Sequence, residues 1–509
     1  MSAETIEVRN PATLEKIADV PVASAAAVAD AVARARKVQA LWQDTSLAER
    51  ARLLYRLRDL LIDKQDRLAE VVTSETGRTR AEAYGNELFY LCDAIGSWAK
   101  KGGGYLKPEK IRPSFLLLKT KKVVSTYAPF GVIGVISPWN FPLTLTLGEA
   151  IPALLAGNAV IVKPSELTPL SALFAVELMT EAGFPQNLFQ VLVGRSETGE
   201  ALVDQVDMVA FTGSVETGKR VMHRATERLI PVSLELGGKD PLIVLQDANL
   251  ERAVGACIWG ALMNCGQTCT SIERVYVEES VYHPFVNKVL EKVRAIRQGP
   301  SEKDVDVGSM ISEAQLRKIE AQVANAVSQG AKVLTGGRRN PQFPGFYYEP
   351  TVLVEVNHSM DIMKDETFGP VIPIMKVKDS TEALRLANDC RYGLSGSIFS
   401  RNLSNAGRIA KGLEAGSVCI NDSLVTFVIP DAPMGGMKES GFGYRHGAAG
   451  IRKYCRQKTI VLDRFGLKQE FQWFPASDRK TRQLRLLLEL ICRSGWRRKL
   501  QALARLARS

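Results

Sequence analysis

The chain has 509 residues, of which 46% are hydrophobic and 24% are charged, so it is too long for one ordinary domain and has the composition of a globular protein. This composition excludes a disordered chain, a collagen and a small disulfide scaffold. The formal net charge is +11, but ten Lys and Arg against one Glu place +9 of it in residues 479–509. The rest of the chain is nearly neutral, and we therefore expect no nucleic-acid partner.

Cysteine and histidine usage narrows the chemistry further. The eight cysteines have irregular spacings, which indicates a reducing compartment rather than a disulfide framework. The first residues show no signal peptide, and we expect a cytoplasmic protein. The four histidines are scattered, which argues against a His-based catalytic triad and against a His-rich site, so we expect no bound metal.

Residues 26–100 combine apolar and charged positions at helical spacing and predict helices. From about residue 123, helical stretches such as Leu170–Ala182 alternate with short apolar runs, which predicts a mostly parallel sheet. The runs are Gly131–Ile136, Ala159–Val162, Phe189–Val193, Met208–Phe211 and Leu242–Leu245. A second set of strands and helices follows over residues 275–377. The sequence thus predicts an α/β fold whose two halves meet in a cleft near residues 235–270.

A glycine loop follows the apolar run that ends at Phe211. Ser214 stands where a helix N-cap would lie, so free backbone N–H groups and the helix dipole would face an anion. The segment from Gly213 through Gly218 nearly matches a phosphate-binding loop, but Arg220 replaces the hydroxyl that holds magnesium, which argues against a nucleotide triphosphatase. A tight turn before a helix explains this segment equally well.

A thiol and a carboxylate are the candidate reactive groups. Cys269 lies in a small, polar segment in which Gly266 permits close backbone approach. Glu235 is flanked by leucines and followed by two glycines, and desolvation there would raise its pKa and make it a base near neutral pH. The alternatives are a buried cysteine and a surface carboxylate at a strand end. Cys265 is interpreted as structural, because no second Cys or His pair accompanies it.

Six motifs, taken in order along the chain, resemble the aldehyde dehydrogenase superfamily, and the resemblance covers about Arg9 to Asp463. They are Pro138–Pro142, Lys163–Glu166, Phe211–Ser214, Glu235–Lys239, Gly266–Cys269 and Glu366–Pro370. The resemblance implies a parallel-sheet cofactor domain, an α/β catalytic domain and a small β oligomerisation flap.

The resemblance also implies a mechanism. Cys269 would attack the aldehyde carbonyl, and the Asn140 side chain with the Cys269 backbone N–H would hold the oxyanion. Hydride transfer to a nicotinamide would leave a thioester, and Glu235 would activate the water that hydrolyses it. A coenzyme A-acylating relative and a non-catalytic scaffold are the competing classes; Glu235 argues against the first, and the joint presence of the three residues argues against the second.

The cofactor positions follow from the same resemblance. Lys163 and Glu166 would bind the adenosine ribose, and Ser214, with Trp139 nearby, would contact the pyrophosphate within the loop of Gly213 and Gly218. Glu366 and Phe368 would hold the nicotinamide ribose and ring. The Glu166 carboxylate would repel a 2′-phosphate, so we expect NAD, with NADP possible.

The resemblance divides the chain into segments. An NAD(P)-binding domain would comprise residues 1–110 and 130–236, and a catalytic domain residues 237–437. Residues 111–129 and 453–463 would form oligomerisation strands, read from Lys119–Tyr127 and Lys458–Leu462, and would give a homodimer or homotetramer. Residues 464–509 would form a basic amphipathic C-terminal extension.

The extension predicts two helices. From Thr481 to Cys492 a helix would place four apolar side chains on one face and Leu486 on the polar side; the four are Leu484, Leu487, Leu488 and Ile491. A second helix would align Trp496, Leu500 and Leu503. The pattern suits peripheral contact with an anionic membrane and equally a helix packed on the enzyme or on a partner subunit.

The resemblance implies a small-molecule aldehyde as the substrate. The stretch that helps to line the aldehyde tunnel in the family is apolar here, with Leu424, Val425, Phe427, Val428 and Ile429. These residues and the extension point to lipophilic or aromatic aldehydes. Alternatively, the same residues belong to the hydrophobic core.

Overall fold

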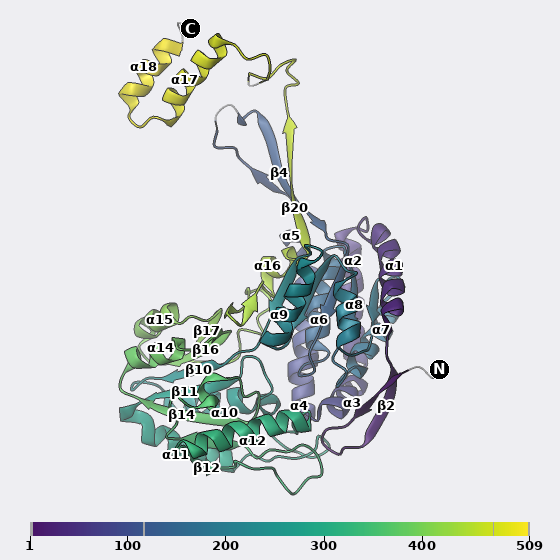
Figure 1. The fold of residues 1–509 in the computed structure, drawn as a ribbon, viewed down its shortest axis with the longest axis vertical. Coiled ribbons are helices and arrows are strands. Elements are labelled where there is room, and N and C mark those ends of the chain that lie inside the picture. The colour runs from purple at the N-terminus through teal and green to yellow at the C-terminus, as the bar shows by residue number, and fades with distance from the viewer. Residues whose placement is uncertain (1–3, 116–117, 472, 507–509) are drawn as a thin grey trace. The chain divides into compact units, whose positions relative to one another are not determined.

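The structure is a computed structural model that describes residues 4–115, 118–471 and 473–506. The chain forms two compact units, residues 1–106 with 128–456 and residues 107–127 with 457–509. Figure 1 shows the elements of both units. None of the described helices combines the length and the apolar character that crossing a bilayer requires.

The first unit begins with an antiparallel hairpin and a series of helices, as the spacing of residues 26–100 predicts. Ser24 and Ser46 each accept a hydrogen bond from the backbone N–H three residues on and cap the first two helices. The elements are β1 (Thr5–Arg9), β2 (Lys16–Pro21), α1 (Ala25–Trp42), α2 (Leu47–Asp63), α3 (Gln65–Thr76), α4 (Arg80–Glu82), a π-helix (Ala83–Phe89) and α5 (Tyr90–Tyr105).

Six strands form the first sheet, in the order β19-β9-β8-β5-β6-β7. The strands from β5 to β9 are parallel, and β19 pairs antiparallel with β9. From β5 the chain proceeds to β6 and β7 on one side and later to β8 and β9 on the other, so the carboxyl ends of β5 and β8 flank a topological switch point, where ligands bind in such sheets.

The predicted apolar runs of this sheet are strands, with small shifts at their ends. The elements are β5 (Val132–Ile136), β6 (Ala159–Lys163), β7 (Phe189–Val191), β8 (Met208–Thr212), β9 (Val232–Glu235), β19 (Gly441–Phe442), α6 (Thr144–Leu155), α7 (Leu170–Ala182), α8 (Ser196–Val203) and α9 (Val215–Thr226).

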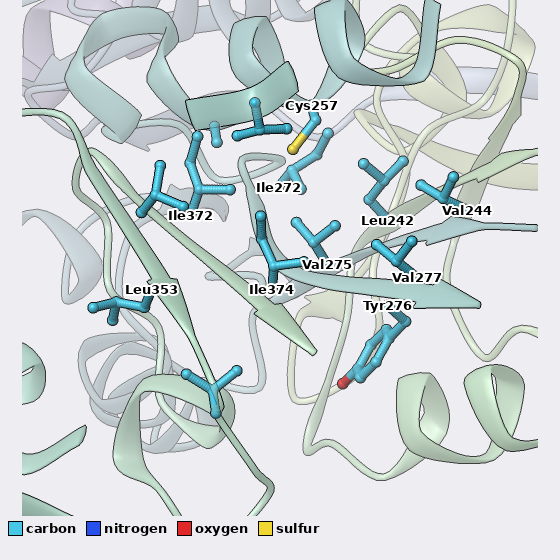
Figure 2. Close-up of a cluster of buried hydrophobic side chains, with 14 of the residues drawn as sticks. Leu242, Val244, Cys257, Ile272, Val275, Tyr276, Val277, Leu353, Ile372 and Ile374 are labelled. Atoms are coloured by element: carbon cyan, nitrogen blue, oxygen red, sulfur yellow. The ribbon is translucent and has the colours of Figure 1, made fainter. Parts of the chain in front are cut away.

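Seven strands form the second sheet, in the order β12-β13-β14-β11-β10-β16-β17, and β12 alone among them is antiparallel to its neighbour. Figure 2 shows its core, in which Val275 and Tyr276 point to opposite faces of β11. Val275 and Tyr276 are both fully buried, so both faces of β11 are covered, as a parallel sheet requires.

The second sheet and its helices have the following bounds. They are β10 (Asp240–Val244), β11 (Ile272–Glu278), β12 (Lys332–Thr335), β13 (Thr351–Val354), β14 (Val371–Val377), β16 (Ser395–Phe399), β17 (Ser417–Ile420), α10 (Leu250–Leu262), α11 (Glu279–Arg294), α12 (Glu313–Ser328), α13 (Asp361–Lys364), α14 (Ser380–Asn388) and α15 (Leu403–Gly412). Shorter elements are a 3-10 turn (Met263–Gly266), the bridge of β15 (Tyr392–Gly393) with β18 (Met437–Lys438), and α16 (Gly447–Arg452).

The two sheets are joined by a very short link. β9 ends at Glu235 and β10 begins at Asp240, so four residues carry the chain from the carboxyl end of one sheet to the amino end of the other. Loops at the carboxyl ends of β5, β8 and β9 therefore meet the segments that precede β11 and β14. This junction is the cleft predicted near residues 235–270.

The second unit consists of a three-stranded sheet and the C-terminal extension. The sheet has the order β20-β4-β3, with β3 (Glu109–Ile111), β4 (Lys121–Pro129) and β20 (Cys455–Asp463). The extension forms α17 (Asp478–Cys492) and α18 (Trp496–Leu506), close to the two predicted helices. Leu486 is half-buried in this hairpin, although the sequence pattern places it on the polar side of the helix.

Candidate functional site

A cavity of about 190 Å³ at the junction of the two sheets collects most of the residues singled out from the sequence. They come from the ends of β5, β8 and β9 and from the segments before β11 and β14, which lie far apart in the chain. The residues are Trp139, Asn140, Gly213, Ser214, Glu235, Cys269, Glu366 and Phe368. The tertiary structure thus brings the candidate nucleophile, base and oxyanion donor into one cavity.

The loop before Cys269 turns through left-handed backbone. Asn264, Cys265 and Gly266 have φ angles of 53°, 56° and 72°. A Cβ on Gly266 would lie 2.2 Å from the carbonyl oxygen of Gly369, so glycine is required there. Cys265 is buried, in keeping with a structural role, whereas Cys269 keeps part of its surface accessible.

Asn140 is tied to this loop by hydrogen bonds. Its Nδ2 donates to the carbonyl oxygen of Gln267 at 3.1 Å. Its own carbonyl oxygen accepts from Asn264 Nδ2 at 3.0 Å and from the Arg78 guanidinium. The side-chain amide is therefore held beside the segment that carries Cys269, where it can donate to an oxyanion.

Glu235 is buried at the end of β9, and its Oε1 has no hydrogen-bond partner among the described residues. Its Oε2 lies 4.0 Å from Arg445 Nε. Burial raises the pKa of Glu235 to about 7, although the charges of Arg445 and Lys453 oppose the rise. The desolvation predicted from its leucine neighbours is confirmed, and Glu235 can exchange a proton near neutral pH.

Behind Glu235 lies a buried ionic network that the sequence did not reveal. Arg445 Nη2 lies 3.1 Å from Glu149 Oε1, and Lys453 Nζ lies 2.7 Å from Glu149 Oε2. Arg445 also donates to Thr212 Oγ1 at 2.5 Å. Burial alone would raise the pKa of Glu149, but the two cations outweigh it and lower the pKa to about 2. Glu149 therefore stays ionised and holds two cations next to Glu235.

The Cys269 thiol is protonated at rest. Burial raises its pKa to about 12, against the opposing charge of Arg445 and with the help of the carboxylates of Asp240, Glu235 and Glu366. Because the thiolate is the nucleophilic form, attack requires a base that takes the proton. Glu235 lines the same cavity and has a suitable pKa.

A second cavity of about 690 Å³ lies along α8 and α9, and Lys163 contributes to its wall. The beginning of α9 lines both cavities, with Ser214 in the smaller one and Thr217 in the larger. Ser214 is the predicted N-cap, and its Oγ accepts from the Thr217 N–H at 3.3 Å. Two cavities that share a helix N-terminus fit a dinucleotide, whose pyrophosphate would lie at that terminus.

The other residues expected to bind the cofactor are Lys163, Glu166 and Gly218. Lys163 Nζ lies 3.3 Å from Glu166 Oε2, so the two side chains form an ion pair at the end of β6. Gly218 lines neither cavity. A Cβ there would lie 2.6 Å from Leu236 Cδ2, and Gly218 instead lets α9 pack against the residue that follows Glu235.

The segment with Glu366 and Phe368 is anchored by a residue that sequence reasoning missed. The Glu273 carboxylate accepts from the Thr367 N–H at 2.7 Å and from the Phe368 N–H at 2.8 Å. Lys239 Nζ completes this buried site, 2.7 Å from Glu273 Oε2. The lysine of the Glu235–Lys239 motif was visible in the sequence, but its partner could not be chosen among many acidic residues.

Phe368 and Glu366 face the cavity from this anchored segment. The Phe368 ring meets the Trp139 ring edge to face, with centroids 5.4 Å apart. Glu366 Oε1 accepts from the Gly238 N–H at 3.1 Å, and burial raises its pKa to about 7. An aromatic wall and a carboxylate beside the thiol fit a nicotinamide ring and its ribose.

Comparison with known proteins agrees with this geometry. The model of the aldehyde dehydrogenase family matches residues 1–460. A Mycobacterium ulcerans protein that carries the name of an NADP(+) succinate-semialdehyde dehydrogenase is 40% identical over 455 residues, 89% of this chain and 87% of its own. A 4,4'-diapolycopene aldehyde oxidase from Methylomonas sp is 37% identical over 474 residues, 93% of this chain and 88% of its own.

A solved structure shows the same fold. The crystal structure of a succinate-semialdehyde dehydrogenase from Burkholderia pseudomallei matches with a TM-score of 0.87 at 36% identity and covers 90% of this chain and 95% of that chain. The matches therefore span both sheets, and the residues after 460 lie outside the matched family segment.

Arg445 is expected to set the pKa of Glu235. In Arg445→Met the positive charge that lowers the pKa of Glu235 is lost, while the negative charge of Glu149 remains. The pKa of Glu235 therefore rises, and we expect the pH profile of aldehyde turnover to shift to higher pH by about one unit or more. Arg445→Lys keeps the charge and is the matched control, with a profile near that of the wild type. If Arg445→Met turns over less at every pH but its pH dependence does not shift, Arg445 has only a structural role.

Proposed function

The chain belongs to the aldehyde dehydrogenase family, and on that premise we propose that it oxidises an aldehyde to a carboxylate with NAD or NADP and releases the product by hydrolysis. The observation that carries the proposal is the single cavity lined by Cys269, Glu235, Asn140 and the aromatic wall of Trp139 and Phe368. Nucleophile, base, oxyanion donor and a place for a nicotinamide occur together there.

We assign the first half of the reaction to Cys269, Glu235 and Asn140. Glu235 takes the thiol proton as the sulfur bonds to the aldehyde carbon, and the Asn140 amide with the Cys269 N–H stabilises the oxyanion. A bound nicotinamide supplies the hydride acceptor. Loss of hydride from the carbon restores the carbonyl and leaves a thioester on Cys269.

In the second half Glu235 acts as the hydrolytic base. After Glu235 has released its first proton to solvent, its carboxylate takes a proton from water as the water oxygen bonds to the thioester carbon. The carbon–sulfur bond then breaks, the Cys269 thiolate takes the proton from Glu235, and the product leaves as a carboxylic acid that ionises in water. A buried base of pKa about 7 in this cavity supports water rather than coenzyme A as the acceptor. The division into a cofactor domain, residues 1–110 and 130–236, and a catalytic domain, residues 237–437, is part of this proposal.

Two substitutions test these roles. Cys269→Ala is expected to lower NAD(P) reduction by aldehyde at least about a thousandfold, because no nucleophile remains. Glu235→Gln is expected to slow both the formation of the thioester and its hydrolysis, and so to lower steady turnover by roughly a hundredfold or more, because the thiol and the water both lose their base. Single-turnover NAD(P) reduction measures the first step, and mass spectrometry of the thioester measures the second. Cys265→Ala is the matched control and should retain turnover. Unchanged activity of Cys269→Ala, or release that depends on added coenzyme A, would contradict the proposal.

We further propose that NAD is preferred. Glu166 forms an ion pair with Lys163, which lines the larger cavity. A carboxylate beside an adenosine bound in that cavity would accept the ribose 2′-hydroxyl and repel a 2′-phosphate. The Mycobacterium ulcerans relative is named for NADP(+), and NADP is therefore the alternative cofactor for this chain.

Glu166→Gln removes the repulsion and should raise the ratio of kcat/KM for NADP over NAD by about tenfold. The ratio is measured at saturating aldehyde. Glu177→Gln, which changes a carboxylate of α7 that pairs with Arg67, is the matched control and should leave the ratio unchanged. A wild-type enzyme that already favours NADP would overturn the NAD preference.

The substrate class we propose is lipophilic or aromatic. Leu424 is buried, and the Phe427 ring lies 4.9 Å from the Tyr90 ring and 5.7 Å from the His446 ring. Val428 and Ile429 remain exposed, and no Lys or Arg occurs between residues 422 and 437. One relative is named for a long polyene aldehyde and another for a short carboxylate-bearing one, and this apolar stretch favours the former.

Turnover of decanal, benzaldehyde and succinate semialdehyde separates the two classes. We expect kcat/KM to be at least about tenfold higher for decanal or benzaldehyde, because the 424–429 stretch offers apolar surface and no cation. Val428→Arg adds a cation there and should improve succinate semialdehyde, whereas Val428→Ala should not. Wild-type preference for succinate semialdehyde would overturn the assignment.

We also propose how the second unit is used. Ile460, Val461 and Leu462 of β20 are exposed, and an apolar edge of this kind pairs with another subunit, which supports a homodimer or homotetramer. The basic extension supports peripheral membrane contact. The cytoplasmic location stays a prediction from cysteine usage.

A further inference from the structure

The C-terminal extension folds as a helical hairpin with one covered side. Helices α17 and α18 lie side by side and are joined by the three residues 493–495, so they run antiparallel (Figure 1). Leu486, Leu487 and Leu490 of α17 are half-buried and Ala502 of α18 is buried. These side chains mark the inner face along which the two helices pack.

A second apolar stripe on each helix is left open. Leu484 and Leu488 of α17 are 49% and 63% exposed, one turn apart. Trp496, Leu500 and Leu503 of α18 are 68%, 54% and 48% exposed, also at helical spacing. Neither stripe is part of the inner face, so the hairpin exposes large apolar side chains that its own folding does not require.

The two open stripes lie on the same side of the hairpin. On each helix the exposed apolar residues lie about 100° around the helix axis from the inner face, in the direction in which the helix turns from its N- to its C-terminus. Because the helices are antiparallel and face one another, the same angular offset carries both stripes to one side. Together Leu484, Leu488, Trp496, Leu500 and Leu503 form one surface, which we call the open face.

The opposite side of the hairpin is charged, which checks this geometry. Glu489 of α17 lies 4.0 Å from Arg505 of α18 and 3.5 Å from Arg493 in the connection. On the helical wheels Glu489 and Arg505 fall about 100° from the inner face in the sense opposite to the open stripes. The hairpin as a whole is therefore amphipathic across its thickness.

Basic residues border the open face. The chain from 464 to 509 contains twelve Lys and Arg against three Asp and Glu. Arg485 and Arg497 fall at the outer margins of the open face, and the Arg497 guanidinium lies 5.4 Å from the centroid of the Trp496 ring. An apolar face with a Trp and a basic rim is the arrangement that binds at the level of anionic lipid headgroups.

We propose that the open face is a docking surface for an anionic membrane. It rests on the membrane contact proposed above and assigns that contact to one side of the hairpin. Charge selects this occupant over a second copy of the chain, because two hairpins would each bring an excess of nine positive charges and the rest of the chain is nearly neutral. Docking would hold the enzyme where lipophilic aldehydes dissolve.

Flotation of the full-length protein with vesicles tests the assignment. Vesicles of phosphatidylglycerol and phosphatidylcholine should bind the wild type, and pure phosphatidylcholine vesicles should bind it weakly. Leu488→Gln and Leu500→Gln should each weaken binding roughly tenfold, because each removes one buried leucine from the lipid contact. Leu41→Gln is the matched control, since Leu41 is a leucine of α1 that is even more exposed than Leu488 and Leu500.

Charge and assembly are measured on the same proteins. Arg485→Gln and Arg497→Gln should lower binding to the anionic vesicles and reduce its salt dependence, and all variants should keep turnover of a water-soluble aldehyde and the helical circular dichroism signal. If the wild-type protein does not float with the vesicles, the proposed membrane contact is wrong. If neither leucine substitution weakens vesicle binding, the open face is not the membrane-binding surface. A changed molecular mass of these variants in solution would show that the open face is a subunit interface instead.

Discussion

The site depends first on a buried ion pair at the link between the two sheets. Lys239 and Glu273 lie 2.7 Å apart, and Glu273 also accepts the backbone N–H groups of Thr367 and Phe368. Removing one member of such a pair leaves a buried charge alone and costs about 3–5 kcal/mol. One carboxylate therefore joins the short β9–β10 link, the start of β11 and the segment that carries Glu366, and it holds three walls of the cavity in register.

A second balance of charges acts on the candidate base. Burial pushes the pKa of Glu235 upward, and Arg445 and Lys453 restrain it near 7. Glu149 keeps those cations in place and remains ionised because both contact it. The same Arg445 opposes the rise in the Cys269 pKa, so one guanidinium influences both reactive groups. The proposed chemistry thus depends on residues that need not contact the substrate.

The extension follows different rules from the enzyme body. The body buries its apolar surface in the two sheets and is nearly neutral, whereas the extension is strongly basic and leaves five large apolar side chains open on one side. Because the open face is not needed for the packing of α17 on α18, it is available for an external surface. A lipophilic aldehyde substrate and a lipid-facing hairpin are consistent with each other, but each proposal can fail alone.

Local sequence determined much of the fold and the identity of the candidate groups. Apolar runs bounded by glycine and polar residues predicted the strands, Ser214 was recognisable as an N-cap, and the leucines around Glu235 predicted its desolvation, because these features depend on near neighbours. The tertiary structure alone decided that Arg445 and Glu149 meet behind Glu235, that Glu273 anchors Phe368, and that Gly218 packs under Leu236. It also decided that Leu486 of α17 is half-buried in the hairpin. These contacts join residues far apart in the chain or on different elements, and many residues of each type could have been chosen, so only the folded chain selects the pair.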